Sequence, residues 1–323
     1  MENDDWIDGF EIFTWSVTVV FWALVAFLAI CLLVVILVVL WEIGRKAVGV
    51  RRSKAEGHIL GLPQGATHVI EDGPSDGPPI ILVHGLTTPA FVFDALVPDL
   101  VARGHRVIRY DHYGRGYSDR PKGLQTASFF RTHLNAIYKA SNIECPAILV
   151  GYSMGGAIVA DFAAMHPDKV KSAYLIAPAG MRTDLGGVLR RAATWPVIGD
   201  FLMHMFFPRM HRKGTDAERV LNVQVPRIIE RQQEELEYRG FVRSVLSSLR
   251  GILAHDLAPE HRRLATLELP VTVIWAEQDQ VIPLEGKRQL EKWNPAARHV
   301  VVPEAGHGVT YTHPQAVLDA ISD

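Results

Sequence analysis

The fold of this chain is decided by the stretch Ala147-Ile148-Leu149-Val150-Gly151-Tyr152-Ser153-Met154-Gly155-Gly156. A short apolar run, 147–150, leads into a serine between glycines, and a helical pattern follows over 154–166. A strand, a sharp turn and a helix in this order form a nucleophile elbow, whose glycines leave room for a serine hydroxyl projecting over the edge of a sheet. The stretch therefore predicts an α/β sheet with Ser153 at the end of a strand.

On both sides of this stretch, short runs rich in β-branched residues alternate with segments of helical period, which indicates a mostly parallel sheet flanked by helices. The expected strands are 67–70, 80–83, 107–110, 147–150, 173–176, 271–275 and 299–302. The expected helices are 89–103, 126–142, 154–166, 284–293 and 314–321. The sequence thus predicts an α/β core built from residues 57–180 and 264–323.

The alternation stops over residues 181–263, where helical patterns follow one another, so we expect a helical cap or lid inserted into the core. This segment contains a soft apolar patch that comprises Trp195, Phe201, Leu202, Met203, Met205, Phe206, Phe207 and Met210. An ordinary buried helix face is the simpler interpretation of each of these residues, and contact with lipid is the alternative.

The amino-terminal region has a different composition from the rest of the chain. An acidic segment, 1–11, precedes the run 12–41, which contains no charged residue and is long enough for a helix to cross a bilayer. The acidic start and the missing small-residue cleavage site speak against a signal peptide, and a buried core helix is the other alternative. A basic segment, 42–56, follows, so we expect a single-pass protein with its amino terminus outside and its catalytic domain on the cytoplasmic side.

The composition of the 323 residues excludes several classes of protein. A 48% share of hydrophobic residues allows a full core and rules out disorder as the main state. The net charge of -2 gives no basic footprint for nucleic acid. Two cysteines, Cys31 and Cys145, cannot form the disulfide framework of a small secreted domain.

A serine hydroxyl needs a general base, which must itself be oriented by a third group. Behind an elbow, the expected chain order is serine, acid, histidine. Asp279 follows the strand predicted at 271–275, and His307 follows the one at 299–302. Of the three Gly-His pairs in the chain, only the pair at His307 comes after both the serine and the acid. We therefore predict Ser153, Asp279 and His307 as the catalytic residues, with Glu277 and Asp256 as chemically capable alternatives to Asp279.

The same chemistry needs backbone donors for a developing oxyanion. The elbow supplies the N–H of Met154, and the loop after the strand predicted at 80–83 supplies the N–H of Leu86, because Gly85 allows a close approach of the backbone. We interpret the neighbouring His84 as a structural turn residue.

Taken together, residues 57–323 resemble the α/β-hydrolase superfamily. Besides the elbow, Asp111-His112-Tyr113-Gly114-Arg115-Gly116-Tyr117-Ser118-Asp119-Arg120-Pro121 is similar to the loop after the fourth strand of this family, and Gly306-His307 with His313-Pro314 is similar to its histidine loop and last helix. The single span, the Gly-x-Ser-Met-Gly-Gly elbow and the cap look most like membrane-anchored monoacylglycerol lipases. That resemblance implies a membrane-facing cap that guides a single-chain lipid ester to the serine. Tyr152 and a cap without a matching motif leave the acyl length and head group open.

We therefore expect a membrane-anchored serine hydrolase that cleaves carboxylic esters of lipids, monoacylglycerols or lysophospholipids, through an acyl-serine intermediate. The alternatives are an enzyme for small soluble esters or carbon-carbon bonds, and a non-catalytic membrane scaffold. A serine nucleophile argues against haloalkane dehalogenases and epoxide hydrolases, which need a carboxylate. The expected partners are the lipid ester and the bilayer, and no metal, cofactor or nucleic acid is implied. The oligomeric state is left open.

Overall fold

The computed structural model describes residues 4–181 and 186–321, with side chains from residue 15 onward among these. Residues 1–3 of the predicted acidic segment, 182–185 of the predicted cap and 322–323 of the predicted core lie outside the described residues.

A single mixed sheet forms the centre of the described chain, with the strand order β1-β2-β4-β3-β5-β6-β7-β8. The strands are β1 His58–Leu62, β2 Gly65–Asp72, β3 Pro79–Val83, β4 Arg106–Tyr110, β5 Ala147–Tyr152, β6 Val170–Ile176, β7 Val271–Ala276 and β8 Arg298–Val302. β2 pairs antiparallel with β1 and β4, whereas all other pairs are parallel. The carboxyl ends of β3, β5, β7 and β8 therefore meet at one edge of the sheet.

The seven predicted strands are confirmed, and one strand was missed. β1 and β2 form a hairpin in which Leu62 lies opposite Gly65. β1 is an edge strand with no fully buried residue. It therefore lacks the continuous apolar run by which buried parallel strands are recognised in a sequence.

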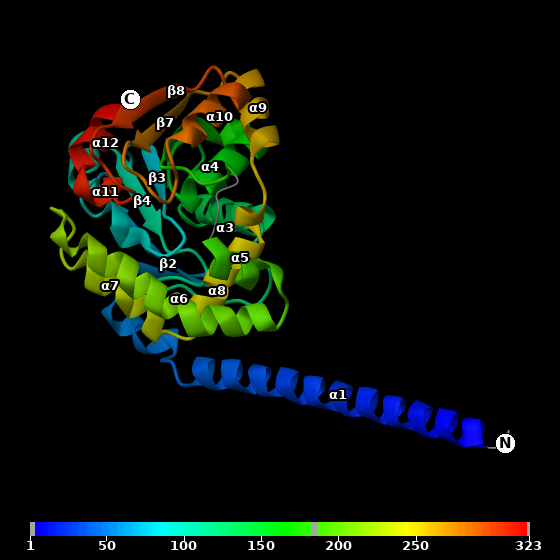
Figure 1. The fold of residues 1–323 in the computed structure, drawn as a ribbon. Helices are drawn as coiled ribbons and strands as arrows, with labels where there is room; N and C mark the ends of the chain where they lie inside the picture. Colours follow the sequence, from blue (N-terminus) through cyan, green and yellow to red (C-terminus); the bar gives the residue numbers. More distant parts are fainter. Residues whose placement is uncertain (1–3, 182–185, 322–323) are drawn as a thin grey trace.

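The two faces of the sheet carry separate apolar cores, which follow from the alternation of side chains along each strand. In β3, Ile81 and Val83 join the core beneath α3 Ala127–Ala140, α4 Met154–Met165, α9 Ala258–Thr266 and α10 Glu285–Trp293. Ile80 and Leu82 join the opposite core, which packs against α2 Val97–Ala102, α11 Val309–Thr312 and α12 Pro314–Ala320. Figure 1 shows these two helical layers on either side of the sheet.

The continuous helix predicted at 89–103 is wrong. The structure has a short 3₁₀ helix, η3 Ala90–Phe93, followed by α2 Val97–Ala102. Pro98 has no N–H to donate to a preceding turn, and it suits the first turn of a new helix, where α2 places it.

Between β6 and β7 the described chain contains no strand and forms a helical insertion. Its α-helices before α9 are α5 Gly186–Thr194, α6 Ile198–Ala217, α7 Ile228–Glu234 and α8 Phe241–Arg250. Met203 and Phe207 are buried with Phe241 and Val245 in a core of the insertion's own. Trp195, Met205, Phe206 and Met210 remain exposed. Only part of the soft apolar patch is therefore an ordinary buried helix face.

The amino-terminal helix, α1 Asp4–Ile43, extends away from the rest of the molecule (Figure 1). In the described part of the chain it is the one helix whose length and composition would allow it to cross a membrane, and its apolar window is not buried. Its carboxyl end is held against the insertion, since Trp41 stacks on Phe201 with ring centroids 5.6 Å apart. Arg239 also donates to the carbonyl oxygens of Glu42 at 3.0 Å and Ile43 at 2.8 Å.

Candidate active site

Ser153 lies between β5 and α4 in a strained backbone conformation. Its φ of 55° and ψ of -117° belong to a region that costs a non-glycine residue about 1–3 kcal/mol. Hydrogen bonds on both sides hold it there: its N–H donates to the carbonyl of Ile176 at 2.9 Å, and its carbonyl accepts from Gly156 at 2.9 Å and Ala179 at 3.0 Å. The turn therefore presents the hydroxyl at the carboxyl edge of the sheet.

Two glycines allow this turn to exist. A Cβ on Gly155 would lie 1.9 Å from the carbonyl oxygen of Val83 in β3. A Cβ on Gly151 would lie 2.3 Å from the carbonyl oxygen of Gly155. Both obstacles are backbone atoms, which cannot rotate away as a side chain can. The first turn of α4 can therefore approach β3 only when position 155 carries no side chain, and it can lie against β5 only when position 151 carries none.

His307 and Asp279 meet Ser153 at this edge. The His307 Nε2 lies 3.1 Å from the Ser153 Oγ, and the His307 Nδ1 lies 2.7 Å from the Asp279 Oδ2. Because an ionised carboxylate only accepts hydrogen bonds, Nδ1 carries the proton and Nε2 is free to accept from the serine hydroxyl. The geometry thus connects the predicted nucleophile, base and acid in one chain of hydrogen bonds.

The loop after β7 fixes the carboxylate of Asp279. Its Oδ1 accepts from the N–H groups of Val281 at 2.7 Å and Ile282 at 2.8 Å, which leaves Oδ2 directed at His307. The alternative acid Glu277 is exposed and accepts instead from the N–H of Glu304 at 3.0 Å. The alternative Asp256 lies between η7 Ile252–Ala254 and α9, and Asp279 is the acid that is hydrogen-bonded to His307.

Leu86 and Met154 flank the serine with backbone N–H groups. Within the described residues, neither N–H donates to a protein acceptor. The loop that carries Leu86 passes close to the nucleophile, since a Cβ on Gly85 would lie 3.3 Å from the Ser153 Cβ. Two free donors beside a nucleophile are the arrangement that an oxyanion requires.

The buried His84 holds the loop of Leu86 in place. Its Nε2 accepts from the N–H of His112 at 2.8 Å, so its Nδ1 carries the proton and donates to the Gly85 carbonyl at 2.9 Å. The His112 ring in turn bonds to the carbonyl of His84 at 2.9 Å. Burial lowers the pKa of His84 to about 4, which keeps the imidazole neutral and suits a structural residue.

A cavity of about 660 Å³ opens in front of Ser153 and His307, between the sheet edge and the insertion; we call it the serine cavity. Its apolar lining comes from both parts and comprises Leu86, Leu189, Phe207, Met210, Leu221 and Val281. Its size and mixed lining are those of a site for a small organic ligand.

Three polar residues of this cavity were not predicted as functional from the sequence. The Tyr152 hydroxyl donates to the carbonyl of His307 at 3.0 Å and so supports the histidine loop. The Tyr311 hydroxyl donates to the Glu218 Oε2 at 2.8 Å. Tyr311 stands four residues after His307, a spacing that could have marked it, whereas Glu218 belongs to the insertion, which has no motif.

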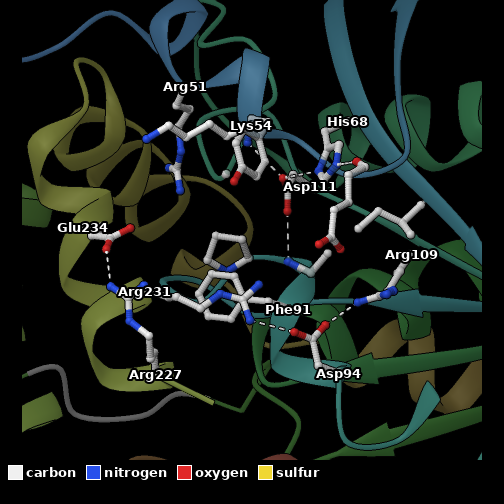
Figure 2. Close-up of a pocket in the computed structure, with 16 residues that line it drawn as sticks. Arg51, Lys54, His68, Phe91, Asp94, Arg109, Asp111, Arg227, Arg231 and Glu234 are labelled. Atoms are coloured by element: carbon white, nitrogen blue, oxygen red, sulfur yellow. Dashed lines mark hydrogen bonds and ion pairs between the residues drawn. The ribbon is translucent and has the colours of Figure 1, made fainter. Parts of the chain in front are cut away.

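A second cavity, of about 350 Å³, lies where the segment after α1, η3 and α7 come together, and we call it the charged cavity (Figure 2). Ser153 is not among its lining residues. Asp94 bridges two of its cations, accepting from Arg231 at 2.7 Å and from Arg109. Arg231 also lies 4.0 Å from the centroid of the Phe91 ring. Most of its charges are paired, and the pairs of Asp94 with Arg109 and Arg231 join the insertion to the core.

Asp111, the first residue of the motif after β4, lies at the back of the charged cavity. It accepts from the His68 Nδ1 at 2.7 Å and from the N–H of Ala90 at 2.9 Å (Figure 2). Burial by itself would raise the pKa of Asp111, but the hydrogen bond from His68 holds it well below its usual range. Among the described residues, no cluster of histidine, cysteine and acidic side chains is arranged to hold a metal ion.

Comparison with known proteins places the chain among hydrolases. Residues 78–311 match the model of the family described as serine aminopeptidase, S33. Lipase 1 of Psychrobacter immobilis is 25% identical over 81% of this chain and 82% of its own length. The 2-hydroxymuconate semialdehyde hydrolase of a Pseudomonas strain is 26% identical over 76% of this chain and 86% of its own length.

Solved structures show the same fold. An esterase from Exiguobacterium antarcticum superposes with a TM-score of 0.69 at 19% identity, covering 82% of this chain and 97% of that one. The enol-lactonase of Burkholderia xenovorans superposes with a TM-score of 0.66 at 23% identity, covering 81% of this chain and 97% of the other.

The glycine at position 155 gives a test of the elbow. We expect Gly155→Ala to lower the free energy of unfolding by about 1–3 kcal/mol or more, because the new methyl group would collide with the carbonyl oxygen of Val83. The matched control is Gly214→Ala in α6, where a Cβ meets no atom within 4 Å and a gain of about 0.5–1 kcal/mol is expected. Urea denaturation followed by tryptophan fluorescence measures both, and equal stabilities would contradict the close approach of α4 to β3.

We expect a fall in pH to lower the free energy of unfolding at pH values above those at which the carboxylates of the protein become protonated. The native pKa of His84 is about 4, below the unfolded value of 6.5, so the unfolded state binds the proton first and stability is lost as the pH falls below 6.5. We expect His84 alone to contribute a loss of about 2 kcal/mol by about pH 5. The free energy of unfolding, measured by urea denaturation at several pH values between 6.5 and 5 for the wild type and His84→Gln, tests this contribution. Its slope against pH should correspond to up to one more proton taken up on unfolding in the wild type than in the variant. Identical slopes would contradict the neutral buried imidazole.

Proposed function

Because the chain belongs to the α/β-hydrolase family of serine hydrolases, we propose that it is a membrane-anchored esterase that releases fatty acid from single-chain lipid esters, monoacylglycerols or lysophospholipids. The observation that carries the proposal is that the hydrogen-bonded Ser153, His307 and Asp279 open into an apolar cavity, in a molecule that also carries a long exposed apolar helix. The related Psychrobacter immobilis protein is named a lipase, which agrees with this substrate class.

The proposed mechanism proceeds through an acyl-serine. The Ser153 Oγ attacks the ester carbonyl while His307 Nε2 takes its proton, and the N–H groups of Leu86 and Met154 stabilise the oxyanion. His307 then gives the proton to the departing alcohol, and the acyl group remains on Ser153. Water then attacks the acyl carbonyl while His307 Nε2 takes a proton from it. His307 returns this proton to the Ser153 Oγ as the acyl–oxygen bond breaks, which releases the fatty acid and restores the serine. Asp279 holds the imidazole in the required tautomer throughout.

The position of α1 supports a lipid substrate. The insertion that forms one wall of the serine cavity contacts the carboxyl end of α1 directly, through the stack of Trp41 on Phe201. Trp195, Ile198 and Phe206 on the same insertion are exposed. If α1 spans a bilayer, the cavity is held at a short distance from its surface. A substrate dissolved in that membrane would then reach Ser153 without crossing bulk water.

The orientation in the membrane follows from charge. Arg45, Lys46 and Arg51 come directly after the apolar helix, and the segment before it is acidic. The bias of basic residues to the cytoplasmic side puts the hydrolase domain in the cytoplasm and the amino terminus outside.

The catalytic assignment is tested by fatty-acid release from membranes that contain monoacylglycerol or lysophospholipid. We expect Ser153→Ala and Asp279→Asn each to lower the rate by at least about 10³-fold, because one removes the nucleophile and the other the correct tautomer of His307. The matched control is Glu277→Gln, an exposed carboxylate two residues from Asp279, which should stay within about twofold of the wild type.

Labelling with a fluorophosphonate, which reacts with activated serines, tests the catalytic residues separately from the lipid substrate. Labelling of the wild type and not of Ser153→Ala would support the triad whatever the substrate. Labelling without release from either lipid, together with rapid turnover of short soluble esters, would remove the lipid from the proposal.

The orientation is tested by protease protection of sealed vesicles from cells that express the full chain. With the cytoplasmic face outward, the hydrolase domain should be digested and a tag at the amino terminus should be protected. The opposite pattern would overturn the orientation, and digestion of both would argue against a span.

A further inference from the structure

A carboxylate from the insertion reaches the side of the serine cavity where His307 stands. Glu218 begins η5 Glu218–Val220, directly after α6, and lines the cavity. Its Oε2 accepts from the Tyr311 hydroxyl at 2.8 Å, and Tyr311 belongs to α11, the short helix after His307. Glu218 and His307 both line this cavity. The carboxylate is therefore linked through Tyr311 to the segment that carries His307, the group that would protonate the leaving alcohol.

Within the described lining of the serine cavity, this carboxylate has no cationic side chain to offset it. None of the described residues that line this cavity is a lysine or an arginine. The adjacent Arg219 is directed elsewhere, with ion pairs to Asp216 at 2.9 Å and to Glu230 at 2.5 Å on the exposed surface. Asp279 adds a second negative charge behind His307. This contrasts with the charged cavity, where arginines and acids are paired with one another.

Glu218 has an oxygen free for a further hydrogen bond. Burial raises the pKa of Glu218, and the hydrogen bond from Tyr311 offsets part of that rise. Its Oε1 has no hydrogen-bond partner among the described residues, and it can accept from a hydroxyl donor.

Neutral polar groups complete this side of the cavity. The Thr88 hydroxyl donates to the Gln232 Oε1 at 3.2 Å. Gln232 is 4% exposed, and its Nε2 has no hydrogen-bond partner within the described chain. The polar side thus offers a carboxylate, an amide and hydroxyls, which match an alcohol that carries hydroxyl groups.

We propose that Glu218 makes the serine cavity select uncharged head groups that bear hydroxyls, as in monoacylglycerol, over head groups that bear a phosphate. This inference rests on the proposed function and chooses between the two substrate classes that it leaves open. A phosphate in the leaving alcohol would be held close to Glu218 in a partly buried site, where like charges repel far more than in water. A hydroxyl in the same place donates to the carboxylate.

The test compares two substrates that differ only in a phosphate, monolauroylglycerol and monolauroylglycerol phosphate, in the same neutral detergent micelles. For the wild type, kcat/KM should favour the uncharged ester. Glu218→Gln keeps the size of the side chain and an acceptor for Tyr311 but removes the charge. We expect it to shift the ratio of the two kcat/KM values toward the phosphate by at least about tenfold, mainly through KM, which corresponds to about 1.4 kcal/mol of repulsion removed.

Two further variants separate charge from packing. Glu218→Asp keeps the charge and should retain most of the preference for the uncharged ester. Glu230→Gln removes a carboxylate that pairs with Arg219 on the exposed face of α7 and does not line the cavity, so its ratio should equal that of the wild type. A wild-type ratio in Glu218→Gln, or a loss of preference in Glu230→Gln, would overturn the proposal.

A binding measurement decides the charge selection without turnover. Lauryl glyceryl ether and its phosphate compete with a fluorophosphonate for Ser153, and the phosphate should compete poorly in the wild type and at least about tenfold better in Glu218→Gln. Equal competition by the two ethers in the wild type would refute the selection. If the wild type releases no fatty acid from either ester while Ser153 is labelled, the proposed lipid function fails, and this competition still decides the role of Glu218.

Discussion

The structure depends on the close approach of α4 to β3 at the elbow around Ser153. Backbone atoms of Val83 and Gly155 are so near that a single methyl group on Gly155 would overlap them. This contact lets Ser153 hold a conformation that an isolated chain would avoid, because bonds to Ile176 and Ala179 fix the turn from the neighbouring strand and its loop. The same approach brings the loop of Leu86 alongside the serine. One steric constraint therefore sets both the nucleophile and its surrounding backbone donors.

The polar groups around the elbow are held in place by hydrogen bonds to one another. Buried His84 and His112 tie the Leu86 loop to the loop after β4, and the Tyr152 hydroxyl supports the carbonyl of His307. One carboxylate oxygen of Asp279 accepts from backbone N–H groups, and the other accepts from His307. Each catalytic candidate is thus held by a neighbour whose own hydrogen bonds leave it little freedom. Such preorganisation is what makes electrostatic stabilisation of a transition state effective.

The insertion connects the core to the amino-terminal helix. Its helices pack around a small core of their own, and its outer side contacts the end of α1 (Figure 1). On its inner side, Arg231 and Asp94 join α7 to the core (Figure 2). Glu218 of the same insertion lines the serine cavity. Charges at the joint are paired, whereas the carboxylate in the serine cavity has no cation beside it among the described residues. The insertion therefore joins the core to α1 and also lines the cavity in front of Ser153.

Local apolar runs, glycines and spacing were enough to predict a mostly parallel sheet flanked by helices, the elbow and the order serine, acid, histidine. The sequence identified Ser153, Asp279 and His307 as residues to test, and the structure brings them within hydrogen-bond distance. It missed β1, whose exposed edge position produces no apolar run, and it joined η3 to α2 across Pro98. Tertiary packing alone brings Glu218 of the insertion to Tyr311, sets Tyr152 against the histidine loop and rests α1 on α6. Each of these contacts joins residues at least 93 positions apart, so their proximity depends on packing between elements, which no local pattern encodes.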